Sequence, residues 1–241
     1  MTVSLEHNWF YVPSGNISKN YIVFPEETAH HASHVLRKKK HKIISVTDGQ
    51  GKLYTARIVV VQPSTIKAEI LEKEIMPALK PPYIDLAFVP LKGNRSEIMI
   101  EKGKELGVRR FLLFISQNGV IKQLKQAKIE RFRHVMISAM VQSQQCMISP
   151  ILPVDDIRSL MENFNDYDRI LVADPSGIKQ VPPGNDSVLL VIGPEGGFER
   201  DEILLFKQAG VELFSLGRRR LRSETAAIAG IVKILAANHI L

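Results

Sequence analysis

The stretch from Leu189 to Thr225 reads LLVIGPEGGFERDEILLFKQAGVELFSLGRRRLRSET. An apolar run, Val188–Ile192, stops at Gly193, and a second apolar run, Val211–Leu216, stops at Gly217. Short apolar runs that end in glycine are typical of buried parallel strands. The stretch therefore predicts an α/β fold in which two parallel strands end in glycine-containing loops.

The two glycine loops predict one ligand pocket. We expect a helix over Asp201–Gln208 between the two strands, so both loops reach the carboxyl edge of the sheet, where α/β proteins bind ligands. Glycine there lets the backbone approach a ligand closely. A simple strand-to-helix turn is the other interpretation of the first loop. The loop lacks the Lys-Ser or Lys-Thr of a phosphate-binding loop, and the acidic Glu195 and Glu199 argue against a bound polyphosphate.

Both loops resemble those of the RsmE family, which are knotted methyltransferases of the SPOUT class that methylate N3 of a uridine in 16S ribosomal RNA. The resemblance rests on Ile192–Phe198 (IGPEGGF) with Glu202, and on Leu216-Gly217 followed by Leu221-Arg222-x-Glu224-Thr225-Ala226. It continues upstream, so that it covers nearly the whole chain, in Leu91-Lys92-Gly93-x-Arg95, Glu105–Val108, His31-x-x-His34-Val35-Leu36-Arg37 and Asp48-Gly49-x-Gly51-x-x-Tyr54.

The resemblance implies a PUA-like RNA-binding β-barrel over residues 1–75, a linker over 76–83 and a SPOUT α/β domain over 84–241 with a trefoil knot. Several features of the sequence agree with this division. Residues 42–72 read as short strands around the turn Asp48–Gly51, and Met76–Pro82 is rich in proline. From residue 84 onward, apolar strand patterns alternate with helical ones, which predicts a parallel sheet.

The pattern also predicts individual elements. We expect strands over Lys42–Thr47, Lys52–Val61, Thr65–Glu72, Ile84–Val89, Phe111–Ile115 and Arg169–Ala173. We expect helices over Glu26–Leu36, Arg95–Leu106, Ala127–Ser143 and Thr225–Asn238. Ser223 is placed to cap the last of these helices.

The resemblance implies S-adenosylmethionine as the cofactor, held mostly by main chain. The expected cofactor-binding residues are Ala173, Ile192, Gly193, Pro194, Gly197, Ser215, Leu216, Gly217, Leu221, Thr225 and Ala226. We expect no metal: His30 and His34 have the i, i+4 spacing of helical metal ligands, but no third ligand lies near them in the sequence.

Two residues after the second loop are candidates for the chemistry. A uracil that loses its N3 proton gathers negative charge on its carbonyl oxygens, which a guanidinium stabilises. Arg222 is the candidate for that role, and a structural or phosphate contact is the other interpretation. Glu224 either orients Arg222 or favours the start of the following helix.

The charge pattern points to a polyanionic partner. The net charge is +7, and the basic excess lies within the first 150 residues. The densest run is Arg37–Lys42, and a second cluster lies in the otherwise acidic C-terminal third; a solvated charge run is the alternative for both. The expected RNA-binding residues are Arg37, Lys38, Lys39, Lys40, Lys92, Arg95, Arg218 and Arg219.

Composition and the resemblance together indicate where the protein is expected to act and with which partners. Cys146 is the only cysteine, which excludes an internal disulfide and fits a reducing, cytoplasmic location. We expect no transmembrane segment and no signal peptide, because no apolar run reaches 18 residues and the N-terminus lacks the signal pattern. The resemblance implies 16S rRNA in the small ribosomal subunit as partner, and a homodimer.

The sequence departs from the family pattern at two places. Ser116-Gln117-Asn118-Gly119 stands where the family has Thr-Glu-Arg-Ser, and Ser138-Ala139-x-x-Gln142-Ser143-x-Gln145 replaces Glu-Ala-x-x-Gln-Ser-x-Arg. The missing arginines leave two alternatives to the uridine-N3 methyltransferase. One is a noncatalytic RNA-binding or ribosome-assembly factor, and the other is a SPOUT methyltransferase with a different RNA target. Binding of S-adenosylmethionine separates the first alternative from an enzyme.

Overall fold

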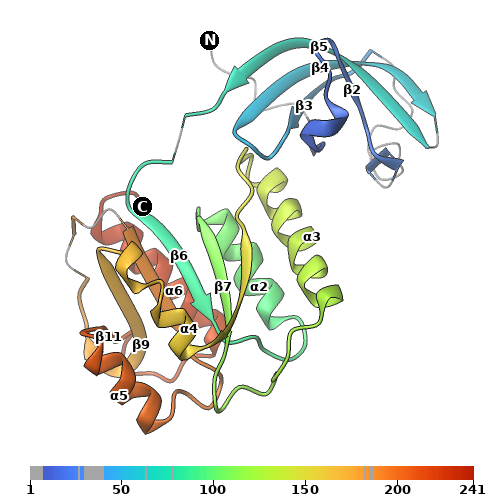
Figure 1. Ribbon diagram of the computed structural model, residues 1–241. Coiled ribbons are helices and arrows are strands. Elements are labelled where there is room, and N and C mark those ends of the chain that lie inside the picture. The colour runs from blue at the N-terminus through green and yellow to red at the C-terminus, as the bar shows by residue number, and fades with distance from the viewer. Residues whose placement is uncertain are drawn as a thin grey trace. The chain divides into compact units, whose positions relative to one another are not determined.

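The computed structural model describes residues 8–26, 28–29, 41–62, 64–77, 79–181, 183–184 and 187–241. The chain divides into two compact units, Met1–Ala78 with Met140–Ile148, and Leu79–Ala139 with Ser149–Leu241 (Figure 1). The domain limits expected from the sequence, at residues 75 and 84, remain a proposal.

The first unit is built on a five-stranded sheet in the order β1-β3-β4-β5-β2. Its core is apolar, and includes an edge-to-face contact of Phe10 with Phe24 at 5.6 Å between ring centroids. The beginning of β5 alternates, with Ile66 and Ala68 buried in the core. The elements are β1 Trp9–Tyr11, η1 Ser14–Asn16, β2 Tyr21–Val23, β3 Ile43–Thr47, β4 Lys52–Gln62 and β5 Thr65–Ile75.

The predicted hairpin turn between β3 and β4 is confirmed, and the segment before Ser149 packs on it. The buried Asp48 accepts hydrogen bonds from the main-chain N–H groups of Gln50 (2.8 Å) and Lys52 (3.2 Å). The N–H of Gly51 donates to the carbonyl of Cys146 at 2.8 Å. The single cysteine is buried there. Nothing local in the sequence connects these segments, so the pattern did not predict their contact.

The second unit contains a six-stranded, fully parallel sheet in the order β11-β9-β10-β6-β7-β8. This confirms the predicted α/β class. The strands run β6 Tyr83–Phe88, β7 Arg110–Ile115, β8 Ile151–Asp156, β9 Arg169–Ile178, β10 Ser187–Ile192 and β11 Glu212–Phe214. The chain order reverses between β6 and β10, so their carboxyl ends flank the point where such sheets bind ligands.

Helices cover both faces of this sheet (Figure 1). On one face, α4 and α5 pack on an apolar cluster that contains Leu112, Leu189 and Phe206. On the other face lie α2 and α6, whose Gly103 and Gly230 leave no room for a side chain against the sheet. The helices are α2 Arg95–Glu105, α3 Gln126–Gln142, α4 Ile157–Met161, η2 Phe164–Asp166, α5 Arg200–Gln208 and α6 Ser223–Ala237.

A buried ionic network stabilises the sheet within β6. Asp85 is fully buried and accepts hydrogen bonds from Arg109 (2.9 and 2.8 Å), Arg110 (2.6 Å) and the hydroxyl of Tyr167 (2.7 Å). Burial, and then the bond to Asp85, raise the pKa of Tyr167. Buried charges need such complete pairing, so the network is structural.

Some sequence expectations need correction. The strand expected to end at Ala173 continues to Ile178, because Gly177 lets it pass directly against Leu213, where a Cβ would lie 2.1 Å from the Leu213 carbonyl carbon. The strand expected over Val211–Leu216 is shorter, Glu212–Phe214, because its pairing with β9 is irregular after Leu213. Most of the helix expected over Glu26–Leu36 lies outside the described residues. No described helix is long and apolar enough to cross a membrane.

Candidate active site

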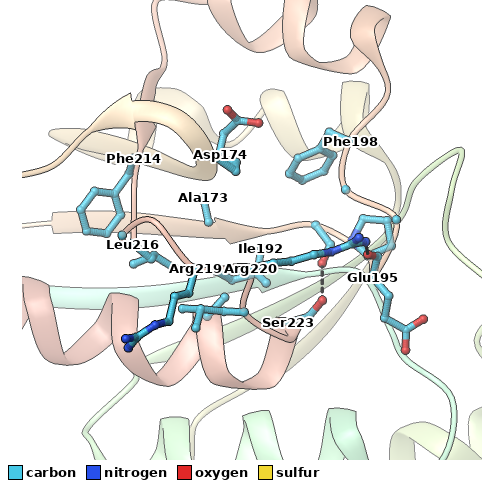
Figure 2. Close-up of a pocket in the computed structure, with 18 of the residues that line it drawn as sticks. Ala173, Asp174, Ile192, Glu195, Phe198, Phe214, Leu216, Arg219, Arg220 and Ser223 are labelled. Carbon is cyan, nitrogen blue, oxygen red and sulfur yellow. Dashed lines mark hydrogen bonds between the residues drawn. The ribbon is translucent and has the colours of Figure 1, made fainter.

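A cavity of about 560 Å³ opens at the carboxyl ends of β10 and β11, beside the middle of β9 (Figure 2). Its size suits a single small-molecule ligand. Main-chain segments of both glycine loops form much of its wall. The lining residues are Ala173, Asp174, Pro175, Ile192, Gly193, Pro194, Glu195, Gly196, Gly197, Phe198, Phe214, Leu216, Gly217, Arg218, Arg219, Arg220, Leu221, Ser223 and Ala226.

The first loop, Gly193–Phe198, is a tight turn held by its own residues. The N–H of Gly197 donates to the carbonyl of Pro194 at 2.9 Å. The ring of Phe198 folds under Gly193, where a Cβ would lie 3.0 Å from the ring. A side chain at 193 would therefore crowd the Phe198 ring, in addition to limiting the close approach of a ligand that the sequence predicts.

The start of α5 anchors the same loop to the strand β7. Glu199 and Glu202 form a reciprocal capping box, in which Glu202 accepts from the N–H of Glu199 at 2.8 Å. The other carboxylate oxygen of Glu202 accepts from the N–H of Gln117 at 2.9 Å. Asn118 adds a long bond from its amide to the carbonyl of Gly197, 3.4 Å. Of the residues that depart from the family pattern, Gln117 supports this end of the first loop through its main chain, and Asn118 through its side chain.

Glu195 is held through both its side chain and its main chain. Its carboxylate forms an ion pair with Arg95 in the first turn of α2. Its carbonyl accepts a hydrogen bond from Arg220 of the second loop at 2.9 Å. From the sequence, Glu195 served only as an argument against a bound polyphosphate. Its pairing with Arg95 and Arg220 was not predicted, because both residues lie far from it in the chain.

The second loop, Ser215–Leu221, forms another wall of the cavity. Gly217 has a φ of +126°, which strongly favours glycine. The hydroxyl of Ser215 accepts from the N–H of Gly217 at 3.4 Å, and Lys233 of α6 donates to the Ser215 carbonyl at 3.1 Å. These bonds fix the beginning of the loop to α6.

Ser223 joins the start of α6 to the first loop. Its predicted role as the cap of that helix is wrong. The N-cap position of α6 is occupied by Arg222, whose side chain makes no capping bond. The Ser223 hydroxyl instead donates to the carbonyl of Gly193 at 3.0 Å. Its side chain is turned to the end of β10 because the helix begins directly beside the first loop.

Most of the expected cofactor residues line the cavity. Ala173, Ile192, Gly193, Pro194, Gly197, Leu216, Gly217, Leu221 and Ala226 do so. Ser215 is buried at the start of the second loop, and Thr225 is exposed on α6. Neither residue lines the cavity. Sequence reasoning missed Asp174, Phe198 and Phe214, although Asp174 could have been found as the residue that follows the expected end of β9.

The candidate catalytic residues lie beside the cavity wall. Arg222 is exposed, and within the described part of the chain its side chain forms no hydrogen bond or ion pair. One carboxylate oxygen of Glu224 is buried without a hydrogen-bond partner among the described residues. No hydrogen bond or ion pair joins the two side chains in the described part of the chain, so the expected orienting role of Glu224 has no support from the geometry.

The expected RNA-binding residues fall into three groups. Arg218 and Arg219 are exposed and line the cavity. Lys92 is exposed in the loop after β6, whereas Arg95 is paired with Glu195. Arg37, Lys38, Lys39 and Lys40 lie outside the described residues, as do His30 and His34.

Basic side chains on α3 are largely used within the protein. Arg131 forms an ion pair with Glu97 of α2 at 2.8 Å. Lys128 donates to the carbonyl of Leu91 at 3.2 Å, and burial lowers the pKa of its ammonium group. Lys128 thus holds the loop after β6, and Arg131 joins α3 to α2.

Comparison with known proteins agrees with this interpretation of the fold and the pocket. The family described as RNA methyltransferase domain matches residues 79–235, and the family described as RNA methyltransferase PUA domain matches residues 24–71. A parallel α/β unit with glycine loops at its carboxyl edge, matched over most of its length by the first of these families, defines an RNA methyltransferase.

Comparison with individual proteins identifies the family within the RNA methyltransferases. Ribosomal RNA small subunit methyltransferase E of Mesomycoplasma hyopneumoniae is 30% identical over 90% of this chain and 95% of its own, and that of Bacillus subtilis is 28% identical over 84% of each. The crystal structure of this methyltransferase from Neisseria gonorrhoeae bound to S-adenosyl methionine has a TM-score of 0.87 and 27% identity, covering 97% of this chain and 98% of its own. The chain belongs to the ribosomal RNA small subunit methyltransferase E family, as the resemblance of its two loops predicted.

Proposed function

We propose that the protein uses S-adenosylmethionine to methylate N3 of a specific uridine in the 16S rRNA of the small ribosomal subunit. The observation that carries the proposal is the cavity between the two glycine loops at the carboxyl edge of the sheet. A relative with the same fold has been solved with S-adenosyl methionine bound. The small-subunit methyltransferase relatives supply the RNA target.

The residues of the cavity fit this cofactor. Ile192, Gly193 and Leu216 line the cavity, and we expect their main chain to hold the adenine. S-adenosylmethionine supplies a methyl group on a cationic sulfonium, so the transfer needs no metal. Because Arg95 and Ser223 both hold the first loop, this side of the pocket is fixed before the ligand arrives, which lowers the entropic cost of binding.

We assign the electrostatic part of the chemistry to Arg222. For N3 of the uracil to accept a methyl group, its proton would have to pass to solvent. Negative charge then gathers on the uracil oxygens, where a guanidinium stabilises it. Arg222 follows Leu221 and precedes Ser223, which both line the cavity, and its unpaired side chain is accessible to an RNA base. Arg218 and Arg219 at the cavity are proposed to contact the RNA.

The wider assembly is part of the same proposal. The knot expected for SPOUT proteins is supported by the return of Ser223 to the end of β10 and by the packing of α6 on that strand. Exposed apolar side chains at the end of the chain, Val232, Ile240 and Leu241, offer a surface for a homodimer. A substrate in the small ribosomal subunit would set the reaction in the cytoplasm.

One experiment tests the function directly. The purified full chain is incubated with labelled S-adenosylmethionine and with small subunits, or naked 16S rRNA, from a strain that lacks the protein, and modified nucleosides are mapped by mass spectrometry. We expect 3-methyluridine at one position. Cofactor binding without any methylation would favour a different RNA target, and the absence of cofactor binding would favour a noncatalytic RNA-binding factor.

A further inference from the structure

Arg220 crosses from the second loop to the first. Its side chain extends past the cavity towards Glu195, where its Nη2 atom donates to the Glu195 carbonyl at 2.9 Å (Figure 2). Three residues later, Ser223 donates to the carbonyl of Gly193 at 3.0 Å. The segment after the second loop is thus joined to the first loop at two points, on carbonyls two residues apart.

These two connections differ in how easily they break. Ser223 is buried, with 6% of its surface exposed, so water does not readily replace its bond. Arg220 is exposed, and a hydrogen bond between an exposed side chain and a carbonyl competes with water. The Ser223 contact therefore acts as the fixed point, and the Arg220 contact is the one that can open and close.

The two loops are also unequally anchored. Arg95, Gln117 and Asn118 hold the first loop from two other segments of the unit. Ser215, at the start of the second loop, is held by Lys233. Among the described residues, the only hydrogen bond between the far part of the second loop, residues 217–221, and the first loop is that of Arg220. Opening of the cavity is therefore expected to involve movement of the second loop, with Arg220 released.

We propose that Arg220 is a positioning residue that holds the second loop over the bound S-adenosylmethionine and so sets how long the cofactor stays bound. The proposal rests on the proposed function, because it takes that cofactor as the occupant of the cavity. Arg220 takes no part in the chemical step. Breaking the bond between Arg220 and Glu195 opens the route by which the cofactor enters and by which the demethylated cofactor leaves, as loop motions often control ligand exchange.

Arg220→Met tests the role, because it keeps much of the side chain's length and removes the donor. Arg200→Met is the matched control: Arg200 is an exposed arginine near the first loop that does not line the cavity, and its side chain makes no hydrogen bond or ion pair within the described residues. In the variant, S-adenosylmethionine should dissociate roughly fivefold faster, as the loss of one exposed hydrogen bond allows. The KM for the cofactor should rise in Arg220→Met and stay unchanged in Arg200→Met.

A measurement without ligand separates loop opening from binding chemistry. Hydrogen exchange of the amides in residues 216–221 should be faster in ligand-free Arg220→Met than in the wild type or Arg200→Met. Arg220→Lys should restore part of the retention, since a lysine can reach a carbonyl but lacks the planar fork. Unchanged dissociation and unchanged exchange in Arg220→Met would overturn the proposal. Failure of the wild-type chain to bind S-adenosylmethionine would instead overturn the proposed function.

Discussion

The hydroxyl of Ser223 lies 3.0 Å from the carbonyl oxygen of Gly193, to which it donates a hydrogen bond. The bond joins the start of α6 to the end of β10 across 30 residues of chain. It connects two segments that the sequence presents as separate motifs. The two motifs meet at this bond, and both of its residues line the cavity.

Removing this bond should weaken both the unit and its pocket. Ser223→Ala leaves the Gly193 carbonyl without its partner, which should lower the free energy of unfolding by about 1–2 kcal/mol. Cofactor affinity should fall with it, because Gly193 lines the cavity. Ser18→Ala is the control, since it removes a hydroxyl–carbonyl bond of 2.9 Å at an exposed turn. Denaturant unfolding and calorimetry measure the two effects; equal stability of the two variants would contradict the role of Ser223.

Gly193→Val should damage the pocket by moving Phe198. A Cβ at residue 193 would lie 3.0 Å from the Phe198 ring, so the first loop must shift to accept it. We expect S-adenosylmethionine to bind at least about tenfold more weakly, with RNA affinity much less affected. Gly15→Val is the control, because no atom lies within 4 Å of a Cβ there. Calorimetry with unchanged cofactor affinity in Gly193→Val would refute the pocket assignment.

Tyr167 should make stability sensitive to alkaline pH. Its pKa is raised in the folded protein, first by burial and then by its bond to Asp85, from an ordinary value of 10.0. The folded state keeps the proton longer than the unfolded state, so its contribution is complete below pH 10 and is lost as pH rises through the raised folded pKa. The wild type should therefore lose stability above pH 10 more steeply than Tyr167→Phe.

At neutral pH, Tyr167→Phe removes the hydroxyl that donates a hydrogen bond to Asp85. Tyr167→Phe should then cost about 1.5–3 kcal/mol, the range for a hydrogen bond to a charged group. Tyr21→Phe, at an exposed residue, should cost little. Urea titrations at several pH values give both results, and parallel pH profiles for wild type and Tyr167→Phe would show that Tyr167 is not the titrating group.

The basic run Arg37–Lys42 should contribute phosphate contacts. Replacing Lys38, Lys39 and Lys40 by glutamine should reduce the salt dependence of RNA binding by nearly one unit of slope per lost contact. Substituting the exposed Lys19 and Lys73 should change the slope less. Binding measured across a range of salt concentrations tests this, and an unchanged slope would make the run a solvated loop.

The sequence predicts strands and loops better than it predicts contacts. Val188–Ile192 could be recognised as a buried strand because both of its faces are covered, which makes the run continuously apolar. The glycine loops could be recognised because their backbone conformations restrict residue type. By contrast, the pairing of Arg95 with Glu195 joins distant parts of the chain through exposed-looking charges, and only the folded sheet brings them together.

Arg222 is the residue on which the proposed chemistry depends. Its backbone is fixed, because its carbonyl accepts from the N–H of Ala226 at 2.8 Å at the start of α6. Its side chain has no partner among the described residues and is free to meet a substrate base. If it stabilises charge on the deprotonating uracil, it acts chiefly in the transition state.

Arg222→Ala should therefore lower kcat strongly, on the order of 10²-fold by analogy with the loss of one oxyanion donor. Cofactor affinity should change much less, because Arg222 does not line the cavity. Arg222→Lys should restore activity only in part, since a point charge does not reproduce the planar guanidinium. Arg200→Ala, which removes an exposed arginine outside the cavity, is the control. Single-turnover kinetics with saturating RNA and cofactor separate the two roles. A normal rate there, together with weaker RNA binding, would make Arg222 a phosphate contact and would remove it from the chemical step.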